Sequence, residues 1–155
     1  VSGQHRAAIE INPVAHGRLK ANRSVSDAYL GSLLSVDLEE QFELVLTKGV
    51  LIHLAPESLE KAYFSLQNWS SRFVLMVEYW NPVPAKIDYR GHQDKLFKRD
   101  FAGEFLDQCP DFRLIDYGFL YHRDKNHEED DMHWFLLEKS EKPEGWIAWR
   151  ADHPA

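Results

Sequence analysis

The stretch Arg72-Phe73-Val74-Leu75-Met76-Val77-Glu78-Tyr79 decides the fold. Its continuous apolar body is typical of a strand in the centre of a parallel sheet, where both faces are covered. An earlier run, Phe42–Thr47, has the same character. Between the two runs, apolar side chains repeat at helical spacing from about Pro56 to Trp69. Strand, helix and strand in this order predict a βαβ unit and a mainly parallel sheet.

The residues before this unit predict a second one. Residues 6–11 form a short apolar run, and we expect a buried strand there. Asn12 is a good helix cap and proline is favoured at the first helical position, so a helix should run from about Pro13 to Lys20. We expect a brief strand at residues 24–26, before a turn at Asp27.

The residues after the unit begin with a long loop, which we expect from Asn81 to about Lys98. Loops of this length are usually functional or disordered. A helix is predicted at 99–108, followed by strands at 112–121 and 133–139. Only a short link joins the last two strands, so they should be antiparallel. The residues beyond Ser140 are expected to form an irregular tail (140–155) on a single domain that comprises residues 1–155.

Composition narrows the class of protein. The chain has 155 residues, of which 44% are hydrophobic, enough for one domain with a real core. A net charge of −7 argues against a protein that binds nucleic-acid backbones. We find no apolar run long enough to span a bilayer and no signal segment, and therefore expect no membrane association. Cys109 is the only cysteine, which excludes an internal disulfide and fits a reducing cytoplasm.

Ligands of open parallel sheets bind outside the carboxyl ends of the strands. We expect Glu10, Asp27, the turn at residues 47–49, and Glu78 with Tyr79 at those ends. An acid that ends a strand suits ribose hydroxyls, because a carboxylate accepts two hydrogen bonds at once. This order of features is similar to that of class I methyltransferases.

Several longer stretches carry a more specific resemblance. They are Thr47-Lys48-Gly49-Val50-Leu51-Ile52-His53-Leu54, Glu78-Tyr79-Trp80-Asn81-Pro82, Tyr89-Arg90-Gly91-His92, Lys95-Leu96-Phe97-Lys98-Arg99-Asp100-Phe101-Ala102-Gly103-Glu104, Asp116-Tyr117-Gly118-Phe119-Leu120-Tyr121-His122-Arg123-Asp124 and Trp134-Phe135-Leu136-Leu137-Glu138-Lys139. In these stretches the chain, from about Ile9 to Lys139, resembles the bacterial methylases associated with pseudaminic acid biosynthesis.

The resemblance implies a Rossmann-like fold and methyl transfer from S-adenosylmethionine to a nonulosonic (sialic-acid-like) sugar or its precursor. By matching positions, Glu10 with Ile11 would hold the ribose and Asp27 with Ala28 would flank the adenine. Thr47, Lys48 and Gly49 would lie beside the sulfonium. The acceptor would be bound by Tyr79, Asn81, Tyr89, Arg90, His92, Lys98 and Arg99.

The sequence departs from the family pattern in one respect. Class I methyltransferases carry an acid-x-Gly-x-Gly loop after their first strand, and none of the eight glycines here has that spacing. We expect a class I domain without its first strand and glycine-rich loop. Because that strand lies between the second and fourth strands in the family, its absence would leave a gap in the sheet. We favour a fragment of a longer chain. Completion by a second copy, as a homo-oligomer, or a different closure of the sheet are the alternatives.

A catalytic base is needed only if the acceptor loses a proton during attack. His53 and Glu78 are the candidates by strand-end position, with His92 as a loop candidate. His53 could also merely orient a loop, and Glu78 could cap a strand. The Arg90, Lys98 and Arg99 group suits a sugar carboxylate, with a solvated basic loop as the plainer interpretation.

Residues 122–133 combine histidines and acids, but their spacing matches no standard metal site, and we expect no metal cofactor. Cys109 is interpreted as a core residue. The alternative function is a non-catalytic, truncated methyltransferase-like protein that binds a sugar acid or a partner subunit.

Overall fold

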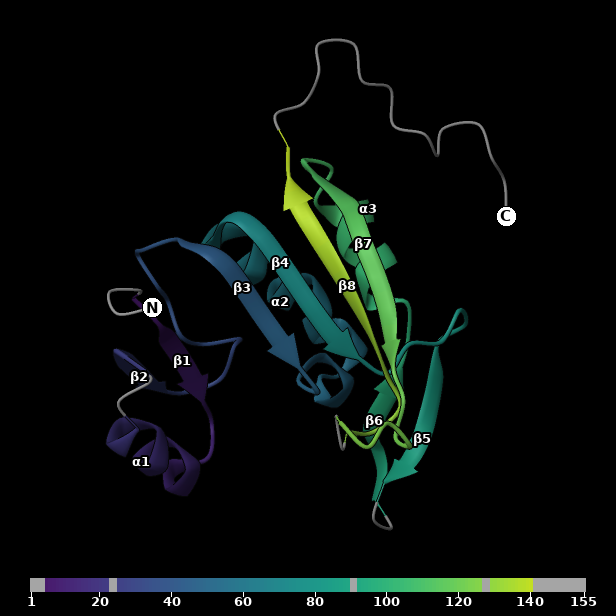
Figure 1. Cartoon of the computed structure of the whole chain (residues 1–155), viewed down its shortest axis with the longest axis horizontal. Coiled ribbons are helices and arrows are strands. Elements are labelled where there is room, and N and C mark those ends of the chain that lie inside the picture. Colours follow the sequence, from purple (N-terminus) through teal and green to yellow (C-terminus); the bar gives the residue numbers. More distant parts are fainter. Residues whose placement is uncertain (1–4, 23–24, 90–91, 127–128, 141–155) are drawn as a thin grey trace. The chain divides into compact units, whose positions relative to one another are not determined.

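The computed structural model describes residues 5–22, 25–89, 92–126 and 129–140. These residues form two compact units, within residues 1–39 and 40–155, which we describe separately (Figure 1). Both units combine helices with strands, so the predicted α/β class is confirmed. Among the described residues, no helix is long and apolar enough to cross a membrane.

The first unit is a parallel β–α–β element: strand β1 (Ala7–Glu10), helix α1 (Pro13–Ala21) and strand β2 (Asp27–Leu30). The predicted cap of α1 is confirmed, because the Asn12 side chain accepts hydrogen bonds from the N–H groups of Val14 and Ala15 at 2.9 and 3.2 Å. The buried His16 ring bonds the carbonyl of Ala28 at 3.0 Å and thereby ties α1 to β2.

The second unit contains a four-stranded sheet in the order β3-β4-β8-β7. The strands are β3 (Phe42–Lys48), β4 (Ser70–Glu78), β7 (Phe112–Leu120) and β8 (Met132–Lys139). β3 and β4 are parallel, and β8 is antiparallel to both β4 and β7. Three strands therefore run in one direction and β8 in the other, and β7 and β8 have the antiparallel orientation that their short link predicts (Figure 1).

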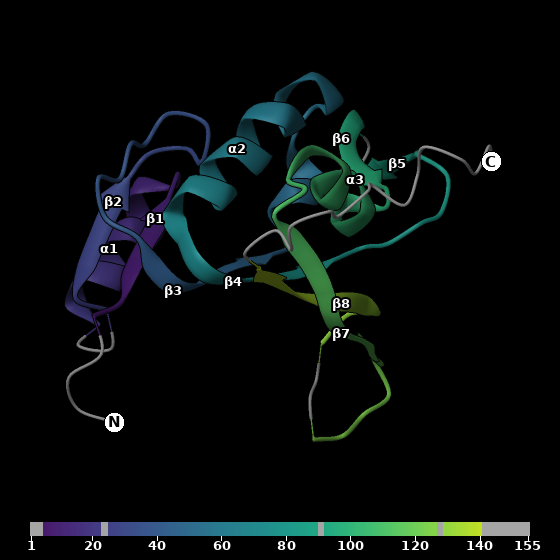
Figure 2. The ribbon, with the colours of Figure 1, turned by 90° about the horizontal axis from the view of Figure 1, so that it is seen from above.

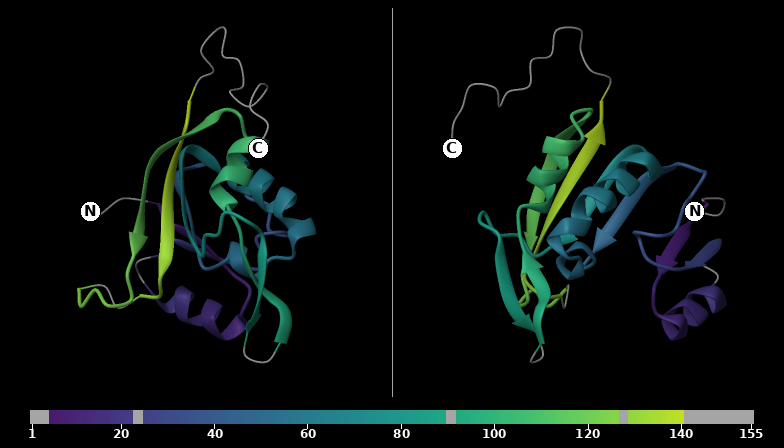
Figure 3. Two further views of the ribbon diagram at one scale, coloured as in Figure 1. Left: turned by 90° about the vertical axis from the view of Figure 1, so that its right-hand side faces the viewer. Right: turned by 180° about the vertical axis from the view of Figure 1, so that it is seen from behind.

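Two helices, α2 (Leu59–Trp69) and α3 (Phe101–Gln108), lie on one face of this sheet (Figures 2 and 3). α2 buries Leu59, Ala62, Tyr63 and Leu66, the residues whose spacing predicts it. Phe105 of α3 packs edge-to-face against Tyr63 and Phe112 at ring distances of 5.9 and 5.0 Å. The strands contribute Val74, Met76 and Leu137, each with 1% or less of its surface exposed, to the same core.

The opposite face of the sheet is apolar but more accessible. Leu44 and Leu46 of β3 are 49% and 56% exposed, and they lie in register with Phe73 and Leu75 of β4, which are half-buried. Among the described residues, β3 pairs only with β4, so its other edge carries no strand. A parallel strand with apolar residues on both faces is typical of a sheet interior, and here it lies at an edge.

Two short 3-10 helices, η1 (Leu51–His53) and η2 (Pro56–Ser58), connect β3 to α2. A hairpin of β5 (Ala85–Tyr89) and β6 (His92–Lys98) lies between β4 and α3, and its β6 strand packs on η1. We predicted an unstructured loop over Asn81–Lys98, which is wrong for these strands. Two short runs on either side of Gly91 are the hairpin signal that the prediction missed.

Candidate functional site

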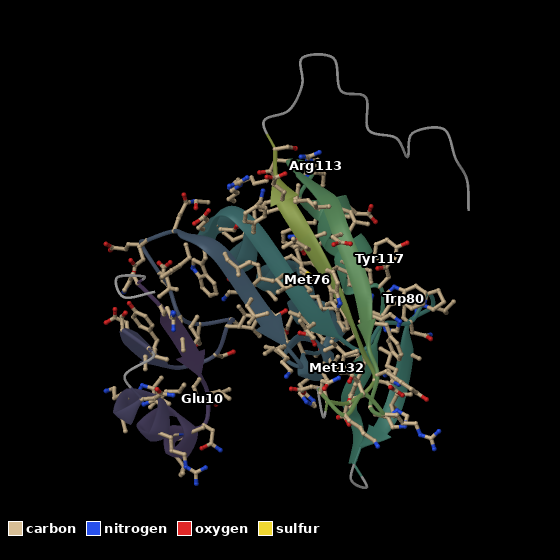
Figure 4. All side chains as sticks on the ribbon, in the orientation of Figure 1. Glu10, Met76, Trp80, Arg113, Tyr117 and Met132 are labelled. Carbon is tan, nitrogen blue, oxygen red and sulfur yellow. The ribbon has the colours of Figure 1, made fainter. Side chains whose placement is uncertain are left out.

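Glu10 lies at the carboxyl end of β1, as predicted (Figure 4). Its Oε1 accepts a hydrogen bond from the Asn12 N–H at 2.7 Å, which holds the carboxylate beside the start of α1. Ile11, directly after it, exposes 69% of its side-chain surface. The carboxylate is therefore oriented by the backbone, and its two oxygens suit a pair of ligand hydroxyls.

Asp27 and Ala28 lie elsewhere than expected. β2 begins at Asp27, in register with Ala7, so both residues lie near the amino end of the strands, and the predicted turn at Asp27 is wrong. Asp27 Oδ2 pairs with the His5 ring at 2.6 Å. Because ligands of parallel sheets bind at the carboxyl ends, this placement does not support an adenine contact by these two residues.

The segment that does follow the carboxyl end of β2 is Gly31–Leu34, which sequence reasoning missed. The Gly31 N–H donates to the Glu10 carbonyl at 3.0 Å, and the Leu34 N–H donates to the Ser32 hydroxyl at 3.1 Å. A Gly-Ser pair immediately after the apolar end of a strand is the turn signal that could have located it.

In the second unit, a cleft with a volume of about 270 Å³ opens at the carboxyl ends of β3 and β4. The end of β3, η1, the end of β4, β6 and the segment leading into β8 all contribute to it; the start of β8 is marked by Met132 in Figure 4. Its lining residues are Lys48, Gly49, Ile52, His53, Tyr79, Leu96, Asp130 and Met132. The lining thus mixes apolar side chains, such as Ile52, Leu96 and Met132, with polar ones, such as Lys48, His53 and Asp130. Both kinds of side chain also line small-molecule sites.

Four predicted site residues meet in this cleft: Lys48, Gly49, His53 and Tyr79. His53 is the last residue of η1, and its backbone N–H donates to the Val50 carbonyl at 3.1 Å. Gly49 has φ +61°, a left-handed conformation that other residues rarely adopt. The glycine therefore allows the chain to turn sharply from β3 into η1.

Glu78 ends β4 with only 2% of its surface exposed. Its Oε1 accepts hydrogen bonds from the N–H groups of Val50 and Leu51 at 3.1 and 3.2 Å, and its Oε2 accepts one from Ile52 at 3.4 Å. Burial raises the pKa of Glu78, and these backbone N–H groups oppose the shift. Thr47, also predicted in the site, is 4% exposed within β3.

Three lining residues, Lys48, Tyr79 and Asp130, make further polar contacts. Lys48 Nζ pairs with Glu129 Oε1 at 2.6 Å, and the Tyr79 hydroxyl donates to Asp130 Oδ2 at 2.8 Å. Lys98 Nζ lies 5.0 Å from the centre of the Tyr79 ring, within the range of a cation–π contact. Glu129 and Asp130, which precede β8, therefore contact the residues at the ends of β3 and β4. Lys98 lies close to Tyr79.

Asn81 and Arg99, two other predicted substrate-binding residues, are not among the residues that line the cleft. The Asn81 side chain donates to the Val83 carbonyl. Arg99 Nε pairs with Glu104 Oε1 at 2.7 Å, and Glu104 Oε2 also accepts from the Tyr63 hydroxyl. Tyr89 and His92 are paired in the hairpin backbone, but their side chains lie outside the described part, as does Arg90.

In the described part of residues 122–133, His122, Asp131 and His133 contact other side chains of the protein. The His122 backbone N–H donates to Asp131 Oδ1 at 3.0 Å, and the His122 ring bonds both carboxylate oxygens at 2.9 Å. The backbone bond, followed by the ring contact, lowers the pKa of Asp131. His133 lies against the rings of Trp80 and Phe119. Across residues 5–22, 25–89, 92–126 and 129–140, no three His, Cys, Asp or Glu side chains are grouped as a metal site; His127 and Glu128 are outside these ranges.

Comparison with known proteins finds similar architectures only among solved structures. No family model matches the sequence, and no curated protein matches it significantly. Among solved structures, the 1,6-didemethyltoxoflavin-N1-methyltransferase of Burkholderia thailandensis, bound to 1,6-didemethyltoxoflavin and S-adenosylhomocysteine, is similar with a TM-score of 0.67 and 11% identity. That alignment covers 87% of this chain and 61% of the Burkholderia chain.

Two further solved structures of methyltransferases are also similar to this chain. The magnesium protoporphyrin IX methyltransferase of Synechocystis, with bound S-adenosylmethionine, has a TM-score of 0.59 and 14% identity over 90% of this chain and 61% of its own. An N-methyltransferase of Bradyrhizobium japonicum has a TM-score of 0.64 and 14% identity over 88% of this chain and 74% of its own. The chain thus spans less than two thirds of the first two of these proteins. It has the fold of S-adenosylmethionine-dependent class I methyltransferases.

Proposed function

We propose that this chain is part of an S-adenosylmethionine-dependent methyltransferase that modifies a small molecule. The observation that carries the proposal is the cleft at the carboxyl ends of β3 and β4, in a fold that it shares with methyltransferases crystallised with S-adenosylmethionine or S-adenosylhomocysteine. Open α/β sheets bind their ligands at such strand ends.

Within each unit, the local geometry of one predicted cofactor residue suits its expected role. Glu10, held by the Asn12 N–H, would accept hydrogen bonds from ribose hydroxyls. Gly49, with its left-handed backbone, lines the cleft and would let the chain approach the methionine portion closely. When bound, S-adenosylmethionine supplies a methyl group that an acceptor atom can take up directly.

The chain's own residues would align the acceptor and handle its proton. Alignment of two reactants supplies much of the rate in a displacement of this kind. Ile52, Leu96 and Met132 would exclude water from one side of the acceptor. The ring of His53, which lines the cleft, would take up the acceptor's proton if the acceptor is a hydroxyl.

We further propose that the acceptor is an acidic sugar of the nonulosonic class. Support comes from Lys48 in the cleft and Lys98 beside Tyr79, because ammonium groups bind carboxylates. Arg99, the predicted partner of that carboxylate, is paired with Glu104, and the two side chains are only 20% and 29% exposed. Lys48 is also paired, with Glu129, but those side chains are 45% and 41% exposed, so a ligand can replace that contact more easily. The two lysines therefore take this role in the proposal. The aromatic ring of Tyr79 would pack against the sugar.

A further part of the protein would complete the cofactor site. The edge of β3 that is unpaired among the described residues, together with exposed Leu44 and Leu46, suits an additional parallel strand. We propose that such a strand, followed by a glycine-rich loop, comes from another segment of a longer chain. The same open edge also supports the alternative function, a partner-dependent, non-catalytic protein that binds a sugar acid.

Calorimetric titration with S-adenosylhomocysteine tests the proposal, on this chain and on a longer chain if the gene encodes an additional strand and glycine loop. Micromolar binding that Glu10→Ala abolishes would support the methyltransferase. If neither folded chain binds the adenosyl ligand while a sialic acid still binds, the non-catalytic alternative would hold instead.

A further inference from the structure

We propose that Glu78 is a positioning residue: its buried carboxylate holds the three successive N–H groups of residues 50–52 and thereby fixes one side of the cleft. The inference rests on the proposed function only in taking this cleft as the acceptor site. It assigns Glu78 a role different from the catalytic one that its strand-end position predicts.

The Glu78 carboxylate is buried and is directed at the backbone of residues 50–52. Both carboxylate oxygens accept hydrogen bonds from the start of η1, and the side chain is 2% exposed. Glu78 is not among the residues that line the cleft. A base must reach the proton that it removes, and this carboxylate instead faces backbone N–H groups.

A carboxylate is the side chain that suits this position. The first N–H groups of a helical turn have no partner within the turn and need an acceptor from elsewhere. An ionised carboxylate accepts several hydrogen bonds and donates none. A glutamine would direct an amide N–H₂ group at one of the backbone N–H donors. Burying a charge is costly unless it is fully hydrogen-bonded, and the three donors at 3.1 to 3.4 Å meet that need.

The loop that Glu78 holds carries much of the cleft. Lys48, Gly49, Ile52 and His53 all lie between the end of β3 and the end of η1, and all four line the cleft. A second backbone bond, from the Gly49 N–H to the Val77 carbonyl at 2.9 Å, joins the same loop to β4 one residue earlier. The end of β4 therefore sets where the Lys48 ammonium and the His53 ring are presented.

Hydrogen exchange measured by NMR tests this directly, without any ligand. In the wild-type chain, the N–H hydrogens of Val50, Leu51 and Ile52 should exchange with solvent slowly, although these residues lie only at the start of the one-turn helix η1. In Glu78→Gln, their exchange should accelerate at least about tenfold more than that of the Leu137 N–H, which reports on the whole sheet. Glu57→Gln, at an exposed acid in η2, is the matched control and should change neither.

A role in overall stability alone would accelerate exchange at Leu137 and at residues 50–52 equally, and that result would overturn the proposal. So would fast exchange of these three N–H groups in the wild-type chain, a measurement that needs no variant to fold.

A second readout reports on the cleft itself. The ring resonances of His53 should shift in Glu78→Gln and stay in place in Glu57→Gln. Unchanged His53 resonances would contradict a positioning role. Titration with S-adenosylhomocysteine is run separately: no binding to the wild-type protein would count against the methyltransferase, whereas the exchange result stands without it.

Discussion

The hydroxyl of Tyr79 donates a hydrogen bond of 2.8 Å to Asp130, which joins the residue that follows β4 to a segment more than fifty residues further along the chain. Lys48 makes a parallel connection from the end of β3 to the neighbouring Glu129. The two acids just before β8 are therefore tied to the residues at the ends of β3 and β4. Both contacts are accessible to solvent, so either can be exchanged for a ligand contact at small cost.

Tyr79→Phe should loosen this segment with little effect on global stability. The lost bond is exposed, and its net contribution is about 0.5–1.5 kcal/mol. Trypsin should then cut faster after Arg123 and Lys125, the basic residues between β7 and β8. Tyr117→Phe is the control, because Tyr117 stacks on Phe135 and no cleft contact is lost. Equal cleavage rates in the wild type and Tyr79→Phe would show that this bond does not hold the segment.

Glu129→Gln should strengthen binding of a carboxylate sugar by up to about fivefold, because an exposed ion pair is worth at most about 1 kcal/mol. The substitution releases the Lys48 ammonium from its internal partner. Calorimetry with a sialic acid and with its methyl ester measures the effect, and only the free acid should gain. Lys48→Met should weaken binding of the acid. A gain that is equal for acid and ester would remove Lys48 as the carboxylate partner.

Gly118→Ala should destabilise the second unit by about 1–3 kcal/mol through overpacking. A methyl group on Gly118 would lie 2.6 Å from the ring atoms of Trp134, its partner across β7 and β8. The midpoint of urea unfolding, followed by tryptophan fluorescence, reports the loss. Gly17→Ala, where nothing lies within 4 Å, is the comparison and should not lower stability. An unchanged midpoint in Gly118→Ala would mean that the ring moves aside freely.

The thiol of Cys109 should resist labelling in the folded protein at pH 8 to 9. Burial, aided by the charge of Asp111, raises its pKa to about 12, and the side chain is fully buried. The thiolate is the reactive species, so a disulfide reagent should label the native chain far more slowly than the chain in urea, where the thiol pKa is about 8.5. Prompt labelling of native protein would show that the Cys109 region opens readily.

The sequence predicts the regular elements well where one signal dominates. The cap at Asn12, the helical repeat of α2 and the apolar runs of β3 and β4 are all found where expected. Each depends on residues close together in the chain, so local pattern is sufficient. The hairpin and the start of β2 are not predictable in this way, because their short strands carry no long apolar run. Asp27 is polar and suggests a turn, although it begins a strand.

The site is only partly predictable for a different reason. Lys48, Gly49, His53 and Tyr79, which strand-end position predicts to lie close together, all line one cleft. Which groups are engaged elsewhere depends on tertiary contacts. Glu104 takes up Arg99, and the start of η1 takes up Glu78. No sequence pattern indicates either of these contacts. Asp130 lines the cleft, but it belongs to an acidic stretch whose composition is typical of a solvated loop.

The position of β8 also determines when this unit can assemble during synthesis. β8 lies between β4 and β7, although it is the last of the four strands to be made. Until residue 139 has left the ribosome, β4 has only β3 beside it and β7 has no partner in the sheet. At about 5–20 residues per second, the nascent chain spends several seconds with one backbone edge of β4 unpaired, and a shorter time with β7 unpaired. Chaperone contact should therefore be concentrated in the interval between the emergence of β4 and that of β8.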